Sequence, residues 1–363
     1  MSRQDASPRS VEERRAEADR YDVRGLHPNV RIGSASDRSA GWIGQVYPRD
    51  VWAGEVTSKP KRVGNESLDD RTLPVASAED YFLHFPDLEI DFTYYRPLLD
   101  PAGTPSPGVF QLQQYADHAP PSARFLLKAP QQFLARRVRR TVAGRVQYVE
   151  NPAFLDSDAF EAHFLAPARD LLGVKLAGVI LEQPYERARD SPSPEAFVAE
   201  WDRFVRDLPS GPPGAPGGVP LHLEVRSPHL LSPAYLDWLA GRGLGFCFSH
   251  WQWLPTLGDQ WRLVGERFTS GTGTAVVRLM QPREMTFDES FRLAHPFDAP
   301  VPELSETGAA KRMVDEAVAL MYKAIDAGVT LHVVGNNRAW GNTPDLARTL
   351  AHRFLDFAER RGQ

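Results

Sequence analysis

Short apolar runs alternate with amphipathic stretches along most of the chain. Runs with the length and composition of buried strands occur at residues 29–35, 87–95, 123–130, 176–184, 219–226, 244–250, 274–281 and 329–337. Nearly continuous apolar runs separated by longer helical patterns are typical of parallel strands that are covered on both faces. The pattern therefore predicts eight parallel strands connected by crossover segments.

The stretches between the runs carry helix signals. Pro194 stands at the start of one of them, where a missing N–H is tolerated, and Phe197, Trp201, Phe204 and Leu208 fall on one helical face. Strand alternating with helix eight times predicts a single (β/α)₈ barrel of the TIM type. The alternative is an open doubly wound sheet. It is disfavoured because no glycine-rich phosphate fingerprint follows the first run.

Three segments do not fit a minimal strand–helix unit. Residues 1–28 are polar and charged, and we expect a flexible or loosely docked tail ahead of a barrel domain at 29–363. Residues 47–76 are rich in Pro, Gly, Lys and Asp and predict a long surface insertion after the first strand. Residues 209–220 form a Pro/Gly loop, which we expect to be mobile and to face away from any active site.

Composition narrows the class of protein. The net charge of −5 and a pI of about 6.1 argue against a nucleic acid as main partner. Cys247 is the only cysteine, so neither an internal disulfide nor a cysteine-based zinc cluster can form. The sequence has no apolar run long enough to span a membrane, and its N-terminus lacks the apolar core of a secretory signal. We therefore expect a cytoplasmic protein.

Polar residues gather where the strands end. Alternation puts Glu89, Asp91, Thr93 and Tyr95 on one face of the second strand, and the apolar face should meet the helices. The same argument turns His222, Glu224 and Arg226 of the fifth strand inward. The other strands end with Lys128, Gln183, His250, Arg278, Asn336 and Asn337. Because the C-terminal ends of barrel strands surround one shared pocket, we expect these side chains to converge there.

Seven short motifs also resemble, in order, those of the YecE-like family, which is catalogued as domain of unknown function seventy-two. They are "SAGW" (39–42), "LEIDFTYYRP" (88–97), "FLLKAP" (125–130), "LEQP" (181–184), "LEVRSPHLL" (223–231), "VVRLMQP" (276–282) and "VGNNRAWGNTPDL" (334–346). The resemblance covers roughly residues 30 to 355. It implies a TIM barrel and leaves the reaction open, because the activity of the family is not established.

The chain departs from the family pattern at several of these motifs. Residues are inserted before Gly41 and Trp42, Asp91 replaces the usual asparagine, Gln281 stands where a histidine-containing ending is usual, and Arg338 follows the two asparagines. These departures predict a divergent member whose substrate differs from that of its relatives.

The predicted pocket suggests acid–base chemistry. Asp91 and Glu224 are candidate paired carboxylates, as in hydrolases or isomerases, and Lys128 is a third candidate catalytic residue, as a base or Schiff-base amine or through binding an anion. The alternative is a structural network in which these carboxylates pair permanently with Lys128, Arg226 and Arg278. One sequence does not give the separation between the groups, so both interpretations stay open.

The remaining polar residues predict the ligand. Arg226 and Arg278 suit a bidentate contact with carboxylate or phosphate. The predicted ligand-binding set further contains Trp42, Tyr95, Gln183, His250, Asn336 and Asn337. No cofactor or metal site is identified. A divalent cation bound by Asp91, Glu224 and His250 is an alternative, whereas His222 and His332 lie inside strands and are interpreted as core histidines.

Three functions are compatible with these observations. The leading hypothesis is an enzyme that acts on a small polar or anionic metabolite, such as a sugar or sugar phosphate. The second is a nucleic-acid-binding or nucleic-acid-processing protein, with the basic run "RRVRR" (136–140) as its footprint, although a solvated surface segment explains that run as well. The third is a barrel that binds a ligand without catalysis. The oligomeric state is not predicted.

Overall fold

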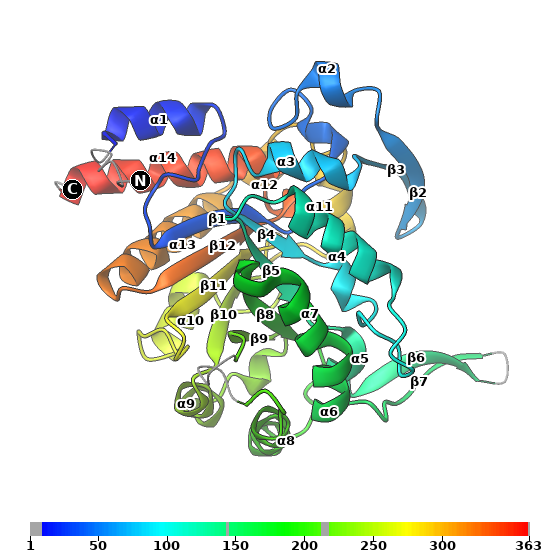
Figure 1. Cartoon of the computed structure of the whole chain (residues 1–363). Coiled ribbons are helices and arrows are strands. Elements are labelled where there is room, and N and C mark those ends of the chain that lie inside the picture. Colours follow the sequence, from blue (N-terminus) through cyan, green and yellow to red (C-terminus); the bar gives the residue numbers. More distant parts are fainter. Residues whose placement is uncertain (1–8, 143–144, 212–217, 362–363) are drawn as a thin grey trace, which may run out of the picture.

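Eight parallel strands form a closed barrel in a computed structural model of the chain, which describes residues 9–142, 145–211 and 218–361 (Figure 1). The order around the barrel is β1-β12-β11-β10-β9-β8-β5-β4. The strands are β1 (Val30–Ser34), β4 (Asp87–Ile90), β5 (Arg124–Lys128), β8 (Leu176–Gln183), β9 (Leu221–Val225), β10 (Gly245–His250), β11 (Thr274–Leu279) and β12 (Thr330–Gly335). The predicted fold class is confirmed, and a strand lies within each of the eight predicted runs. The second run is shorter than predicted, because β4 ends at Ile90 and residues 92–94 form a 3-10 turn.

Helices surround the barrel, and serine or threonine side chains cap several of them. Ser193 accepts a hydrogen bond at the start of α8, whose face with Phe197, Trp201 and Phe204 is buried. The main helices are α4 (Pro107–His118), α7 (Ala166–Leu172), α8 (Pro194–Arg206), α9 (Pro233–Arg242), α10 (Leu257–Leu263), α13 (Gly308–Asp326) and α14 (Thr343–Arg361). Further helices are α2 (Arg49–Trp52), α3 (Ala78–Tyr81), α5 (Gln131–Leu134), α6 (Ser157–Phe160), α11 (Phe287–Ala294) and α12 (Pro302–Ser305).

The barrel interior has polar ends and a thin apolar middle. Its middle level is a small apolar cluster that includes Leu126, Ile180, Cys247, Val276 and Val334. The much larger apolar core lies between strands and helices. At the N-terminal level, Asp87 binds Arg31 and His332, so His332 is a bonded core histidine. At the C-terminal level, the inward side chains are charged, and this level borders the candidate site.

The N-terminal segment packs against the C-terminal helix. In α1 (Val11–Asp19), Ala18 is buried, and Arg15 pairs with Asp356 at 2.7 Å and with Glu359 at 3.0 Å in α14. Figure 1 shows α1 lying along α14. The domain boundary expected at residue 28 stays a prediction. Among the described residues, no helix is long and apolar enough to cross a membrane.

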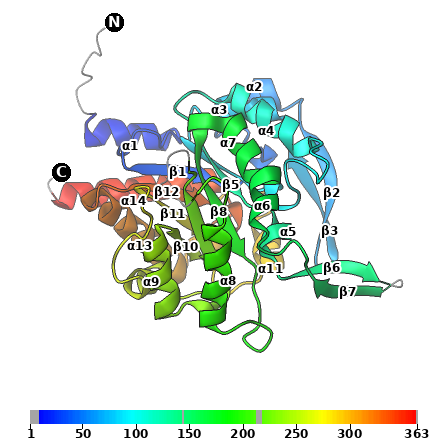
Figure 2. The same ribbon diagram turned by 60° about the horizontal axis from the view of Figure 1, so that its bottom comes forward.

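Two antiparallel hairpins extend from the C-terminal ends of strands. The insertion after β1 contains the first, β2 (Thr57–Val63) with β3 (Glu66–Thr72). The second follows β5 and consists of β6 (Arg137–Val142) and β7 (Arg145–Glu150), which project from the barrel (Figure 2). Most of the basic run 136–140 lies on β6. The Pro/Gly loop 209–220 precedes β9, and its residues 212–217 lie outside the described part of the chain.

Candidate functional site

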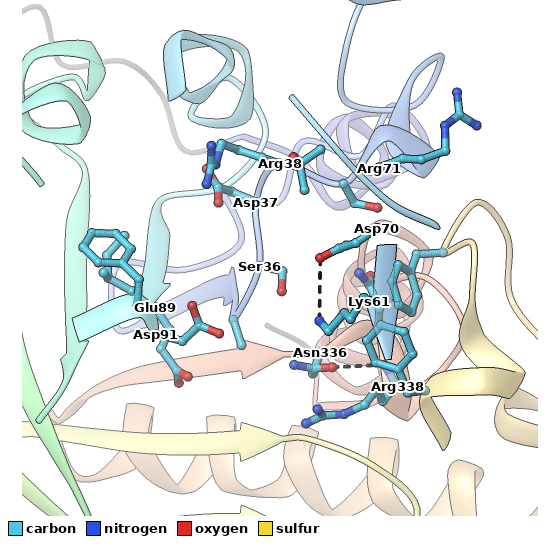
Figure 3. A pocket seen from close by; sticks show the side chains of 18 of the residues that line it. Ser36, Asp37, Arg38, Lys61, Asp70, Arg71, Glu89, Asp91, Asn336 and Arg338 are labelled. Atoms are coloured by element: carbon cyan, nitrogen blue, oxygen red, sulfur yellow. Dashed lines mark hydrogen bonds and ion pairs between the residues drawn. The ribbon is translucent and has the colours of Figure 1, made fainter. Parts of the chain in front are cut away.

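A pocket of about 350 Å³ opens at the C-terminal mouth of the barrel. Its walls come from the ends of β1, β4 and β12, from the hairpin β2–β3 and from α11. Glu89 and Asp91 project from one side, and Lys61 and Asp70 of the hairpin project from the other (Figure 3). The loop after β12 adds Arg338.

A buried ion network lies at the base of this mouth. Arg278 is 2% exposed and makes a bidentate contact with Glu89, with Nε–Oε2 and Nη2–Oε1 distances of 2.8 and 2.6 Å. The same guanidinium binds Glu224, which is completely buried. Burial by itself would lower the pKa of Arg278, but the two carboxylates Glu224 and Glu89 hold it well above its ordinary value.

Glu182 brings the remaining two cations into the network. Its Oε2 atom lies 2.9 Å from Lys128 Nζ and 2.8 Å from Arg226 Nη2. Burial opposes ionisation of Glu182, but Arg226, Lys128 and Arg278 together hold its pKa well below the usual range. Three carboxylates and three cations therefore balance one another's charge within the protein, although Glu224 Oε1 and Arg226 Nε make no hydrogen bond in the described structure.

Aromatic rings cover the outer cations of the network. Lys128 Nζ lies 4.0 Å from the ring centre of Tyr94, and the Arg226 guanidinium lies 3.8 Å from that of Trp251. Together with the ion pairs, these contacts hold both side chains in place. Lys128, Arg226 and Arg278 are thus the cations of an internal network, as in the structural alternative weighed above.

Asp91 is outside this network. It immediately follows β4, its side chain is exposed at the pocket, and among the described residues its carboxylate has no hydrogen bond or ion pair. The protein that surrounds it on most sides reduces its hydration and raises its pKa, an effect that Lys128 opposes and Glu89 reinforces. Asp91 is consequently an unpaired carboxylate at the pocket.

Arg338 is the corresponding unmatched cation. Its guanidinium lies 4.3 Å from the ring centre of Phe287 and 5.8 Å from that of Trp251, and its buried Nε has no hydrogen-bond partner in the described structure. Burial, together with the nearby charges of Arg226 and Arg278, lowers the pKa of Arg338 to about 10. Asp91 and Glu182 oppose this shift, and the arginine stays protonated at neutral pH. Among the described residues, no carboxylate forms an ion pair with the Arg338 guanidinium.

The two asparagines after β12 have different roles. Asn336 lines the pocket, and its side-chain oxygen accepts a hydrogen bond from the backbone of Arg338 at 3.1 Å. Asn337 is buried, and its oxygen accepts from the backbone and hydroxyl of Thr343, both at 2.9 Å. Asn337 therefore fixes the start of α14.

A further acidic group lies in the loop after β1. Asp37 is buried at the pocket wall, and the Tyr115 hydroxyl lies 2.9 and 2.8 Å from its two carboxylate oxygens. Burial raises the pKa of Asp37, while Arg38 opposes the rise. Sequence alternation did not find Asp37, because it lies on a loop rather than on a strand.

The comparison with known proteins fits this architecture. The sequence pattern of the "Protein of unknown function DUF72" family matches residues 70–361. The chain belongs to the DUF72 family. This confirms the resemblance drawn from the seven motifs.

Solved DUF72 structures share the fold. A DUF72 family protein from Thermotoga maritima is 15% identical, with a TM-score of 0.52, over 90% of this chain and 99% of its own. One from Enterococcus faecalis is 11% identical, with a TM-score of 0.51, over 90% of this chain and 95% of its own. No curated protein matches the sequence. The DUF72 match begins at residue 70, so β1 and all of β2 precede it.

Some residues of the predicted binding set do not reach the pocket of this DUF72 protein. Trp42 is completely buried and packs on Tyr47 and Phe85 in the core outside the barrel. Gln183 is buried, and its Oε1 accepts a hydrogen bond from the Arg226 backbone. Their contacts are internal, which argues against direct ligand binding by either residue.

His250 and Tyr95 are placed very differently. His250 Nδ1 contacts the Gln281 carbonyl at 2.8 Å, burial lowers the pKa of the histidine to about 4, and the residue borders a separate cavity. Tyr95 lines the main pocket and is 80% exposed. Among the described residues, no group of three His, Cys, Asp or Glu side chains could hold a metal, so Asp91, Glu224 and His250 do not form the alternative cation site.

Proposed function

We propose that this DUF72 protein is an enzyme that acts on a small polar metabolite carrying an anionic group, such as a sugar phosphate. The observation that carries the proposal is a pair of unmatched charges, Asp91 and Arg338, on the walls of one pocket. The other charges at this level of the barrel are matched within the protein. An unpaired charge kept in a pocket suggests a partner that arrives from outside.

Asp91 supplies the acid–base function in this proposal. Glu89 lies two residues earlier and is committed to Arg278 through two hydrogen bonds, whereas Asp91 has no partner and a raised pKa. Two carboxylates whose environments differ in this way can take different roles, with the unpaired one exchanging the proton. Hydrolysis and isomerisation both require such a group.

Arg338 supplies the binding function. Its planar guanidinium lies over Phe287 and is held near the pocket without a carboxylate. A phosphate or carboxylate would satisfy its free N–H groups and neutralise its charge. The exposed ring of Tyr95 on the pocket wall offers an apolar face to the body of a sugar.

Thermal unfolding tests the binding half of the proposal. Phosphate, titrated against chloride at matched ionic strength, should stabilise the wild type by about 2.7 kcal/mol at a hundredfold excess over the dissociation constant. Arg338→Met should abolish this gain, whereas Arg203→Met, at an exposed position on α8, should preserve it. Equal effects of phosphate and chloride on the wild type would contradict the proposal.

Turnover tests the catalytic half. A panel of sugar phosphates and related anions should contain a compound that the wild type converts and Asp91→Asn converts at least about a hundredfold more slowly, the usual contribution of a positioned acid or base. The Asp91→Asn variant should still bind phosphate. Binding without any turnover across the panel would favour a barrel that binds its ligand without catalysis.

The nucleic-acid alternative rests on the second hairpin. Arg137, Arg139 and Arg140 are exposed on β6, and Tyr148 on β7 is 62% exposed. Arginines beside an exposed aromatic ring suit the backbone and bases of a single strand. A gel shift that weakens with salt and is lost when the three arginines are replaced would favour this function.

A further inference from the structure

The hairpin β2–β3 forms one wall of the pocket. Its ladder runs from Thr57 paired with Thr72 to Val63 paired with Glu66. In this register, Lys61 and Asp70 belong to the same face of the hairpin. Figure 3 shows both side chains directed toward the pocket, whereas the guanidinium of Arg71 points away from it. The hairpin therefore presents a selected set of side chains to a ligand.

Contacts with α11 and the loop after it hold the hairpin in position. Val63 is buried, Glu66 pairs with Arg292 at 3.0 Å, and the Asp69 carbonyl contacts His295 Nε2 at 2.9 Å. Isolated two-stranded hairpins are marginally stable in water, so these contacts matter for its order. The hairpin is a docked part of the pocket wall, and its side chains have defined positions relative to the mouth.

The ammonium group of Lys61 makes no hydrogen bond to another described residue, so its N–H groups are available to a ligand. Its Nζ lies 3.7 Å from Asp70 Oδ2, beyond hydrogen-bond distance, and both side chains are partly exposed. Such an ion pair is weak. The same Nζ lies 4.6 Å from the ring centre of Phe291. Phe291 and Phe287 are one helical turn apart on α11, and their ring centres are 5.8 Å apart.

Two of the cations that line the pocket therefore lie over neighbouring rings of one helix. Lys61 covers Phe291, and Arg338 covers Phe287. Both cations line the same pocket, where an anion between them would relieve the repulsion of their like charges. Phosphate has enough oxygen atoms to bind an ammonium and a guanidinium at once, which a single carboxylate does less well.

We propose that Lys61 and Arg338 form a clamp for the phosphate of a phosphorylated metabolite, and that the hairpin β2–β3 determines specificity. This inference rests on the proposed function. Asp91 lies across the pocket from Lys61 (Figure 3), so in this proposal the phosphate serves as a handle and the reacting bond lies toward Asp91 and the barrel. Because β2 precedes the DUF72 match, the clamp lysine belongs to a segment outside the family pattern.

Matched lysine variants on the same hairpin test the clamp. Lys61→Met should weaken phosphate binding about tenfold, the loss expected for one charge-assisted hydrogen bond, as measured by thermal unfolding against phosphate concentration. Lys61→Arg should retain most of the affinity. Lys59→Met removes an equal charge from an exposed position of β2 that does not border the pocket, and should leave affinity unchanged within about twofold.

The outcomes separate the clamp from the proposed function. If phosphate stabilises the wild type and Arg338→Met abolishes the effect, but Lys61→Met behaves like Lys59→Met, the clamp is wrong and the anion site remains. If phosphate does not stabilise the wild type, both proposals fail. If Lys61→Met unfolds at a much lower temperature without phosphate, the phosphate affinities of Lys61→Gln and Lys61→Arg provide the test. The clamp predicts that Lys61→Arg binds phosphate more tightly than Lys61→Gln, and equal affinities would contradict it.

Discussion

The buried ion network and the pocket wall contain the same residue types, yet they treat charge in opposite ways. In the network, Arg278 contacts Glu89 and Glu224, and every cation has a carboxylate. At the pocket wall, Arg338 has no carboxylate and Asp91 has no cation within hydrogen-bond distance among the described residues. The number of charges at the mouth is therefore a poor guide to ligand binding. The charges without a partner in the protein are the better candidates for contacts with a ligand.

The two arginines show the difference in their pKa values. Burial by itself lowers the pKa of both. In Arg278 the glutamates reverse this effect and hold the pKa well above its ordinary value, whereas in Arg338 the neighbouring arginines add to it and lower the pKa to about 10. One guanidinium is thus stabilised by the fold and the other is left in an unfavourable environment. Natural proteins retain such unfavourable groups mainly at functional sites.

The largest expected effect comes from breaking the network. Arg278→Met leaves Glu89 and Glu224 buried without their shared cation, and should reduce the free energy of unfolding by about 3–5 kcal/mol. Urea denaturation with wild type and variant measures the loss. If the variant does not fold, Arg278→Lys provides the comparison, because it keeps one charge and loses the bidentate contact. A loss below about 1 kcal/mol would show that the network is not structural.

A smaller effect is expected at the edge of the network. Lys128→Met removes one of the cations around Glu182, while Arg226 remains in contact with the same oxygen atom. We expect a loss of about 2 kcal/mol, less than for a fully broken pair. Stabilisation by phosphate should persist in this variant. Loss of the phosphate effect with unchanged stability would instead support the sequence-based hypothesis that Lys128 binds the anion.

The smallest effect is expected at Asp91, and it has the opposite sign. A raised pKa means that the folded protein disfavours the ionised carboxylate, so its contribution destabilises the fold above the folded pKa and vanishes below the unfolded one. Asp91→Asn should therefore raise stability at pH 7 and leave it unchanged at strongly acidic pH. The gain should stay below about 1 kcal/mol, because the side chain is exposed and solvent screens it. Lower stability of the variant at pH 7 would contradict an unpaired Asp91.

Strand patterns predicted the barrel and part of the mouth. Alternation correctly turned Glu89, Asp91 and Glu224 away from the helices, because the apolar partners on each strand had to meet them. On β8, however, the predicted residue was Gln183, whereas Glu182 shares the face of the interior residue Ile180. The omitted glutamate pairs with the predicted cations, and the charge balance could not be recognised without it.

Sequence patterns could not locate the residues that distinguish the pocket. Arg338 and Asp37 lie on loops, where no periodicity relates position to direction. Lys61 lies on an insertion whose contacts with α11 are far apart in sequence. The predicted asparagine pair does border the pocket, but the side-chain oxygen of Asn337 is occupied by Thr343, the first residue of α14.

The pairing of the first barrel strand, β1, with the last, β12, has a consequence for folding. β1 pairs with β12, and the adjacent contact between Asn29 and the Val329 carbonyl joins residues 300 positions apart. During synthesis, the edge of β1 that pairs with β12 therefore stays unpaired until nearly all of the described chain has been made. Loop closure over such a separation slows folding, and exposed strand edges invite association with other chains. Nascent copies of this barrel should need chaperone protection until β12 emerges from the ribosome.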